Sequence, residues 1–154
     1  MSALSATAKN GLADPWLAEL VAIRASQLNH CAFCLDMHLA IARRQGPSQE
    51  VPPTGPSREW ERQLDLLAAW EEAEGVYDER ERSALALTEA VTVLTGDAAR
   101  TTTGGGFVPD EVYEQAAKHF DEVQLAHLVG LIVAINNWNR VMVARRIAPG
   151  SPAW

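Results

Sequence analysis

Apolar residues recur at three- and four-residue spacing through most of the chain, which predicts helices rather than strands. Asp14-Pro15 opens a first helix with proline at its first position, and Asn29-His30 interrupts the pattern. A second helix is expected from about Cys31 to Gln45, with Asn29 as its candidate N-cap. The fold class predicted from this pattern is all-α.

Four more helices are expected in the rest of the chain. They are predicted at about 58–74 with Ser57 as cap, from a capping box at Asp78 and Glu81 onwards, in a short stretch opened by Pro109, and at about 122–146 with Asp121 as cap. The last of these is apolar most of the way round, so we expect it to be the central, buried element. Residues 46–57 and 101–106, rich in proline and in glycine respectively, are expected to be irregular connections.

Length and composition predict a single globular domain. A chain of 154 residues can bury a core without disulfides or metals. Its content of 47% apolar and 21% charged residues is ordinary for a soluble protein. We expect one helical domain over residues 13–147, a flexible N-terminus over residues 1–12 and a tail over residues 148–154.

Charge and hydropathy argue against two classes of partner. A net charge of −7 disfavours nucleic acid, because binding to phosphates needs a basic surface. No run of eighteen apolar residues exists, so we expect no membrane-spanning segment. Residues 1–12 lack the apolar centre of a signal peptide, and we therefore expect a cytoplasmic protein.

The candidate chemistry lies in one C-x-x-C motif. Cys31 and Cys34 are the only cysteines, and His38 follows four residues later. On a helix these three positions fall within an arc of roughly 60°, so their side chains share a face. The motif suits a redox-active dithiol better than a structural staple. A helix start and His38 are both expected to raise the thiolate fraction, and the second thiol would resolve a sulfenic acid.

Glu19 is the candidate partner of this histidine. It lies on the preceding helix, twelve residues before Cys31. Two antiparallel helices joined at Asn29 would bring its carboxylate beside the thiols, where it could orient His38.

A family resemblance is carried by Glu19 and by residues 24–38, which have the sequence RASQLNHCAFCLDMH. This pattern, followed by Ala42 and Gly46, resembles the core of the AhpD-like alkylhydroperoxidases of the carboxymuconolactone decarboxylase superfamily. Residues 81–86, 89–92, 118–120 and 135–140 are similar to later segments of small one-domain members. The resemblance covers most of residues 13–145 and implies an AhpD-like helical bundle.

The resemblance also implies a role for each site residue. Cys34 would attack the peroxide, Cys31 would resolve the product, His38 would relay the proton and Glu19 would act as base. The best-studied members carry a further active-site histidine between the two cysteines, where this chain has Phe33, which implies a shorter relay. No cofactor is expected.

The implied partners are a hydroperoxide, a dithiol protein reductant of the lipoamide or thioredoxin type, and further copies of the chain. A dimer, trimer or hexamer is expected. Asn136, Asn137 and Asn139 lie on an otherwise apolar helix and need hydrogen-bond partners, which a contact within such an oligomer would supply.

Other interpretations of the motif remain open. Cys31, Cys34 and His38 could supply three ligands to a zinc ion. The chain could instead be a lactone decarboxylase, a general thiol–disulfide oxidoreductase, or a metal- or redox-sensing module. The remaining conspicuous side chains are interpreted as structural: His119, His127 and the core-spaced tryptophans Trp60, Trp70 and Trp138.

Overall fold

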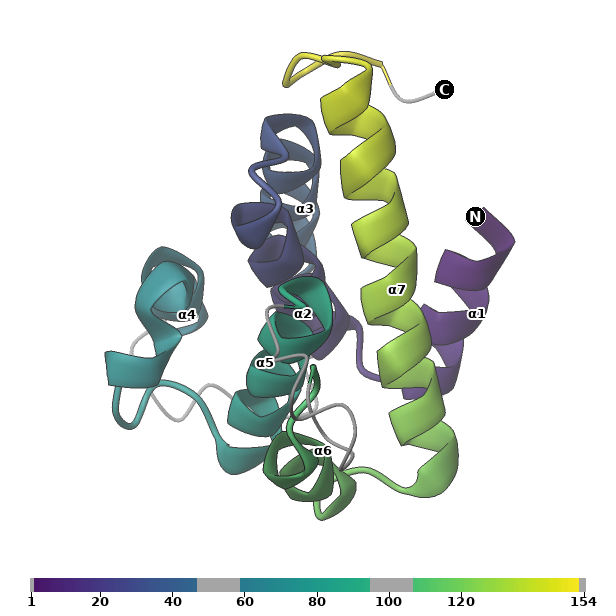
Figure 1. The fold of residues 1–154 in the computed structure, drawn as a ribbon. Helices are drawn as coiled ribbons and strands as arrows, with labels where there is room; N and C mark the ends of the chain where they lie inside the picture. The colour runs from purple at the N-terminus through teal and green to yellow at the C-terminus, as the bar shows by residue number, and fades with distance from the viewer. Residues whose placement is uncertain (1, 47–58, 95–106, 153–154) are drawn as a thin grey trace.

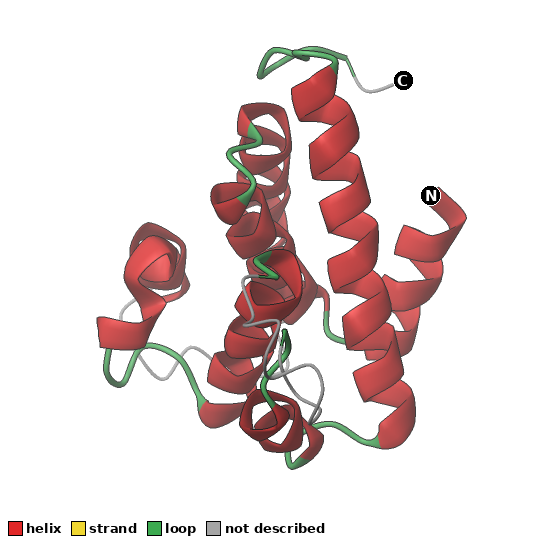
Figure 2. Ribbon diagram, viewed as in Figure 1, coloured by secondary structure: helices red, strands yellow, loops and turns green. Residues whose placement is uncertain are grey.

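The computed structural model describes residues 2–46, 59–94 and 107–152. These residues form α1 (Ser2–Leu12), α2 (Pro15–Leu28), α3 (Ala32–Gln45), α4 (Glu59–Leu66), the 3₁₀ helix η1 (Leu67–Glu72), α5 (Glu79–Thr92), α6 (Asp110–Ala117) and α7 (Glu122–Ala144). Figure 2 shows helices joined by loops, with no strand in the described part of the chain. The predicted all-α fold is confirmed. Of the connections expected at residues 46–57 and 101–106, only Gly46, the C-cap of α3, is described; the rest, including the proposed cap Ser57, lies outside the described residues.

The element at the centre of the fold is α2 rather than α7. Ten of the fourteen residues of α2 are buried, and it packs against α3, α5 and α7 (Figure 1). By contrast, α7 runs between α1 and the other helices (Figure 1), but it leaves Val123, Val133 and Val143 exposed. The prediction that the last helix is the central, buried element is therefore wrong in its burial, because an apolar circumference does not by itself ensure that every face is covered.

The helix starts follow the capping residues in the sequence. The Asp14 side chain accepts a hydrogen bond from the Leu17 amide at 3.0 Å, with Pro15 in the first helical position. Asp78 and Asp121 each form a reciprocal capping box with the residue three positions later. These three predicted starts are confirmed. The tail prediction remains a prediction, although Ile147 packs against the apolar cluster that contains the two cysteines.

Two predicted helix boundaries are wrong. Asn29 is the C-cap of α2, and the N-cap of α3 is Cys31. The helix expected over residues 58–74 ends as an α-helix at Leu66 and continues as η1. Within η1, Ala69 has non-helical backbone angles, with φ at −127° and ψ at 34°. Trp60 of α4 packs edge-to-face on Trp16 of α2, with ring centroids 5.9 Å apart.

The N-terminus differs from the flexible segment that the sequence predicts over residues 1–12. Residues 2–12 form α1, which packs along α7 with Ala8 and Leu12 buried (Figure 1). A close approach at Gly11 makes this packing possible. A Cβ atom at that position would lie 2.1 Å from the ring of His127 on α7.

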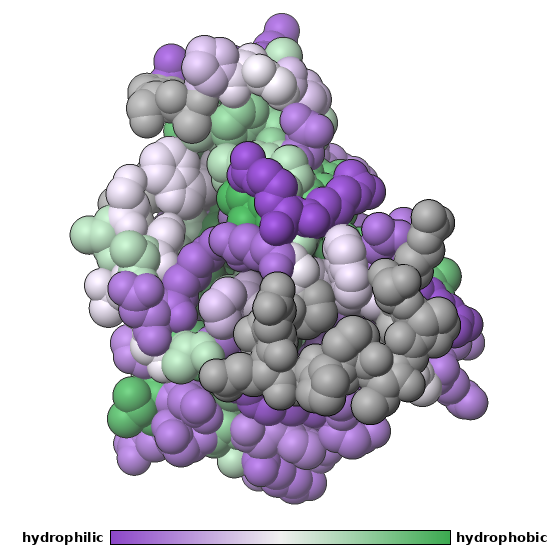
Figure 3. Space-filling view, turned by 180° about the vertical axis from the view of Figure 1, so that it is seen from behind, coloured by the Kyte–Doolittle hydropathy of each residue, from purple (hydrophilic) through white to green (hydrophobic). Residues whose placement is uncertain are grey.

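Hydrophilic residues cover much of the surface. Figure 3 shows one face on which hydrophilic residues predominate, with smaller apolar areas between them. No helix within the described residues is long and apolar enough to cross a membrane.

Candidate active site

The C-x-x-C motif forms the first turn of α3. Cys31 is the N-cap residue, and its Sγ accepts a hydrogen bond from the Cys34 amide at 3.3 Å. The two Sγ atoms lie 2.6 Å apart, both residues are 2% exposed, and both thiols are free. The two sulfur atoms are therefore close enough for a disulfide to form between them after a small movement.

Glu19 and His38 meet beside this turn. The short loop at Asn29 folds α3 back against α2, and Oε2 of Glu19 lies 2.7 Å from Nδ1 of His38. Both residues are buried, at 3% and 6% exposure. The two helices thus bring Glu19 to His38, while the predicted role of Glu19 beside the thiols remains a prediction. If Nδ1 donates its hydrogen to the carboxylate, Nε2 is the ring nitrogen left to accept a proton.

Lys9 is a site residue that the sequence analysis missed. Its ammonium group, carried by α1, forms an ion pair with Oε1 of Glu19. Burial raises the pKa of Glu19, but hydrogen bonds and charge from His38 and then from Lys9 outweigh burial, so the net pKa is lowered. The spacing of Ala8 and Leu12 fits a helix over these residues, but no signal in the sequence places that helix beside Glu19.

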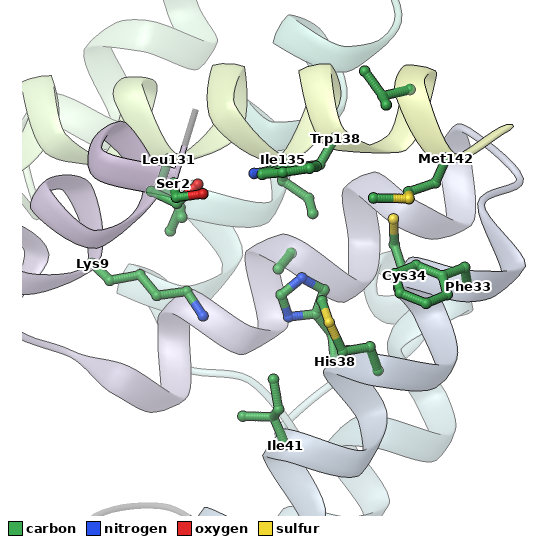
Figure 4. A pocket seen from close by; sticks show the side chains of 14 residues that line it. Ser2, Lys9, Phe33, Cys34, His38, Ile41, Leu131, Ile135, Trp138 and Met142 are labelled. Atoms are coloured by element: carbon green, nitrogen blue, oxygen red, sulfur yellow. The ribbon is translucent and has the colours of Figure 1, made fainter. Parts of the chain in front are cut away.

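A cavity of about 660 Å³ lies between α1, α2, α3 and α7. In Figure 4, Lys9 lies on one side of this cavity and Cys34 on the other, with His38 between them. Cys34 lines the cavity, whereas Cys31 does not. The wall is mostly apolar, and its lining residues include Ile41, Leu131, Ile135, Trp138, Val141 and Met142. Trp138 was interpreted as core packing; it is half-buried and forms part of this wall.

The electrostatic environment of Cys34 is opposite to the one expected. Burial among Phe33, Met142 and neighbouring apolar side chains, together with the hydrogen bond to Cys31, raises the pKa of the Cys34 thiol to about 12. A hydrogen bond from Asn139 acts in the other direction but does not offset the rise. The expectation that the helix start makes this thiol acidic is therefore wrong, since desolvation is the larger effect. In the resting site Cys34 is a protonated thiol.

A buried network of amides lies on the α7 side of the cysteines. Nδ2 of Asn139 donates to Oγ of Ser26 at 3.0 Å, and Nδ2 of Asn29 donates to Oδ1 of Asn139 at 3.1 Å. Asn29 also donates to Oδ1 of Asn136 at 2.8 Å, and Asn136 in turn donates to Oγ1 of Thr92 at 2.9 Å. Asn136 and Asn139 thus find their partners within the chain, and the expectation that an oligomer contact supplies them is wrong for these two.

The proposed zinc ligands do not form a metal-binding group. In residues 2–46, 59–94 and 107–152, no three His, Cys, Asp or Glu side chains are arranged to hold a metal ion. His38 faces Glu19 through Nδ1, and Cys31 lies outside the cavity lining. His119 and His127 do not line the cavity either, and His127 packs its ring over Gly11.

Comparison with known proteins assigns the chain to a family. The model of the carboxymuconolactone decarboxylase family matches residues 1–51, a segment that holds all four predicted site residues and Lys9. The uncharacterized protein YdfG of Bacillus subtilis (strain 168) is 38% identical over 126 residues, which span 82% of this chain and 71% of that protein. The chain belongs to the carboxymuconolactone decarboxylase family.

A solved structure supports the AhpD-like form of this family. The crystal structure of ATU0492 from Agrobacterium tumefaciens, a protein of unknown function with a suggested assignment as antioxidant defence protein AhpD, superposes with a TM-score of 0.75. The two chains are 29% identical, and the match covers 98% of this chain and 88% of that one. Family and fold together indicate a role of the peroxidase or decarboxylase type.

Proposed function

We propose that this member of the family is a thiol peroxidase that reduces organic hydroperoxides. The observation that supports the proposal most directly is the placement of two free thiols side by side, of which only Cys34 lines a cavity that His38 also lines. A peroxide in the cavity would therefore contact the Cys34 thiol first. The Cys31 thiol does not line the cavity but lies next to Cys34, where it can react with the oxidised sulfur. Catalysis by a lactone decarboxylase would give no use to this pair.

The proposed reaction has two chemical steps. The Cys34 thiol transfers its proton to His38, and the thiolate attacks the outer oxygen of the hydroperoxide. The O–O bond breaks, the substrate leaves as an alcohol after taking up a proton, and Cys34 becomes a sulfenic acid. The Cys31 thiol then displaces hydroxide, which leaves as water, and the Cys31–Cys34 disulfide forms. Glu19 holds His38 in orientation through the contact with Nδ1.

The cavity favours an organic substrate over hydrogen peroxide. Its volume of about 660 Å³ falls within the range of ~300–1,000 Å³ that is typical of small-molecule sites. A molecule close to the size of water, which occupies roughly 30 Å³, would leave most of this space and its apolar wall unused. An alkyl or aryl group would cover the apolar side chains that α3 and α7 present.

Two partner proposals accompany this function. A protein that carries a slender dithiol, such as a lipoamide arm, would suit the reduction step, because both cysteines are only 2% exposed. A thioredoxin-type reductant would need the surface around the site to open.

We also propose that the chain forms a homo-oligomer, a dimer, trimer or hexamer. Light scattering after size-exclusion chromatography tests this, and a species near 16.8 kDa would contradict it.

The deciding experiment is stopped-flow oxidation of the reduced protein by cumene hydroperoxide. The expected result is rapid loss of two thiols, which Cys34→Ser abolishes. The Cys31→Ser variant should accumulate a sulfenic acid that dimedone traps. Hydrogen peroxide, tested in parallel, should react more slowly than the organic substrate.

Oxidation no faster than that of a free thiol of similar pKa would overturn the peroxidase. Rapid reduction of small disulfides under the same conditions would then point to a thiol–disulfide oxidoreductase. Loss of carboxylate from a lactone substrate, unaffected by Cys34→Ser, would point to the decarboxylase.

A further inference from the structure

Lys9, Glu19 and His38 form a linear chain of contacts from three helices. The ammonium group of Lys9 on α1 pairs with Oε1 of Glu19 on α2, and Oε2 of the same carboxylate lies 2.7 Å from Nδ1 of His38 on α3. The Glu19 side chain is 4% exposed, and the Lys9 side chain is 33% exposed. Each carboxylate oxygen therefore has a partner of its own: Oε1 pairs with a residue of α1, and Oε2 pairs with a residue of α3.

A buried carboxylate stays ionised only if its partners compensate for lost hydration. His38 offers one hydrogen bond, which occupies one of the two oxygens. The charged groups that influence Glu19 from the packed elements are Lys9 of α1 and His38 of α3, and both favour the ionised form against burial. Without Lys9, the carboxylate would depend on the histidine alone.

The state of Glu19 decides what His38 can do. An ionised Glu19 accepts the Nδ1 hydrogen and leaves Nε2 free to take a proton from a group in the cavity. A protonated Glu19 is a donor instead, and it would favour the tautomer in which Nδ1 accepts and Nε2 carries the hydrogen. That second tautomer could not accept the proton of the Cys34 thiol through Nε2.

We propose that Lys9 is a positioning residue of the site, which keeps Glu19 ionised and oriented so that His38 receives the Cys34 proton at Nε2. The inference rests on the proposed peroxidase function and extends it to a residue outside the C-x-x-C segment. Lys9 acts through Glu19 and is not itself a proton carrier. It also gives α1 a functional role, since that helix completes the site that α2 and α3 begin.

A second role for Lys9 competes with this one. Lys9 lines the cavity on the side away from Cys34, so its ammonium group could contact a carboxylate on the substrate. Such a contact would affect anionic substrates alone, whereas a positioning role affects every substrate. An uncharged hydroperoxide therefore separates the two.

The test measures single-turnover oxidation by cumene hydroperoxide across pH for Lys9→Met, Lys9→Gln and Lys9→Arg. We expect Lys9→Met and Lys9→Gln to slow Cys34 oxidation by about 10- to 100-fold at neutral pH, part of the ~10²- to 10⁴-fold that a positioned base supplies. The acid limb of the pH–rate profile should move to higher pH, because the pKa of Glu19 rises when the Lys9 charge is removed. Lys9→Arg should restore most of the rate. Lys118→Met, which removes an exposed lysine whose ammonium group donates to Gln115, is the matched control.

Imidazole ¹⁵N chemical shifts give a readout that needs no activity. We expect the Nδ1–H tautomer of His38 in the wild type and a larger Nε2–H population in Lys9→Met. A folded Lys9→Met with wild-type shifts and an unmoved acid limb would overturn the inference, even if the wild type is a fast peroxidase. A rate loss confined to a carboxylated hydroperoxide would overturn it too, and would make Lys9 a substrate contact. Slow oxidation of the wild type with the expected change in shifts would refute the peroxidase and leave the role of Lys9 intact.

Discussion

The most quantitative prediction concerns the resting state of the Cys34 thiol. Burial and the adjacent Cys31 move its pKa from an ordinary value of 9.0 to about 12. At neutral pH the thiolate fraction then falls about a thousandfold, which corresponds to ~4 kcal/mol of extra free energy to ionise the group. The structure therefore predicts a site whose nucleophile is almost entirely un-ionised until a base acts on it.

A difference titration measures this directly. The ultraviolet absorbance of thiolate is followed against pH in the reduced wild type and in Cys34→Ser, and the difference isolates Cys34 from Tyr77, whose pKa is also raised to about 12 by burial. The expected difference signal has no step near pH 9 and rises only toward strongly alkaline pH.

Two further variants test the assigned causes. Cys31→Ala removes a group that raises the pKa of Cys34, so the step should move to lower pH. Asn139→Ala removes a donor that lowers the pKa of Cys34, so the rise in thiolate absorbance should move to higher pH. A wild-type midpoint at or below 9, or shifts of the opposite sign in the two variants, would refute the reasoning.

Three other predictions concern stability. The reduced protein should lose stability as the pH rises from about 9 toward 12, since the stability that a raised thiol pKa contributes is complete only below the unfolded-state value. The disulfide form should lose less over this range, because only the loss from Tyr77, which both forms share, remains; denaturant titration of both forms checks the difference. Gly11→Ala should destabilise the fold by about 1–3 kcal/mol because the new methyl group meets His127, and an added His127→Ala should relieve most of the cost in thermal unfolding. Asn139→Ala should cost about 1–3 kcal/mol in chemical unfolding, because Oγ of the buried Ser26 loses the hydrogen bond that it accepts and keeps only its own donation to the Ala22 carbonyl; an unchanged midpoint would contradict the network.

Much of the site could be predicted because its signals are local. Cys34 and His38 belong to one helix and Cys31 is its N-cap, so short sequence spacing alone brings the three side chains near one another. Glu19 needs one further step, which is that a short loop returns the chain antiparallel. The same reasoning explains why the helix starts at Asp14, Asp78 and Asp121 were predictable: each cap acts within one turn of its own helix.

The parts that could not be predicted depend on packing between distant segments. Lys9 reaches Glu19 only because α1 lies along α7, and nothing in the local pattern fixes that position. The amide network joins α2 to α7 through Asn29 and Asn139, more than a hundred residues apart. The pKa of Cys34 also depends on a distant segment. The position of Cys34 at a helix start predicts a lowered pKa, but some of the side chains that desolvate its thiol, such as Met142, come from α7.

The raised pKa of the Cys34 thiol and the contacts from Lys9 to His38 can be explained by one requirement, which is that Cys34 reacts only when a neighbouring group takes its proton. A low-pKa thiol reacts with any electrophile that reaches it, whereas a protonated and buried thiol reacts only where a base removes its proton during the attack. Here His38, the proposed base, lines the same cavity as the Cys34 thiol, and a substrate must enter that cavity to meet both. Selectivity would then come from the cavity and the proton transfer together rather than from intrinsic reactivity. On this reasoning, substitutions in the relay should slow reaction with hydroperoxides far more than reaction with an alkylating agent at high pH, where hydroxide replaces the base.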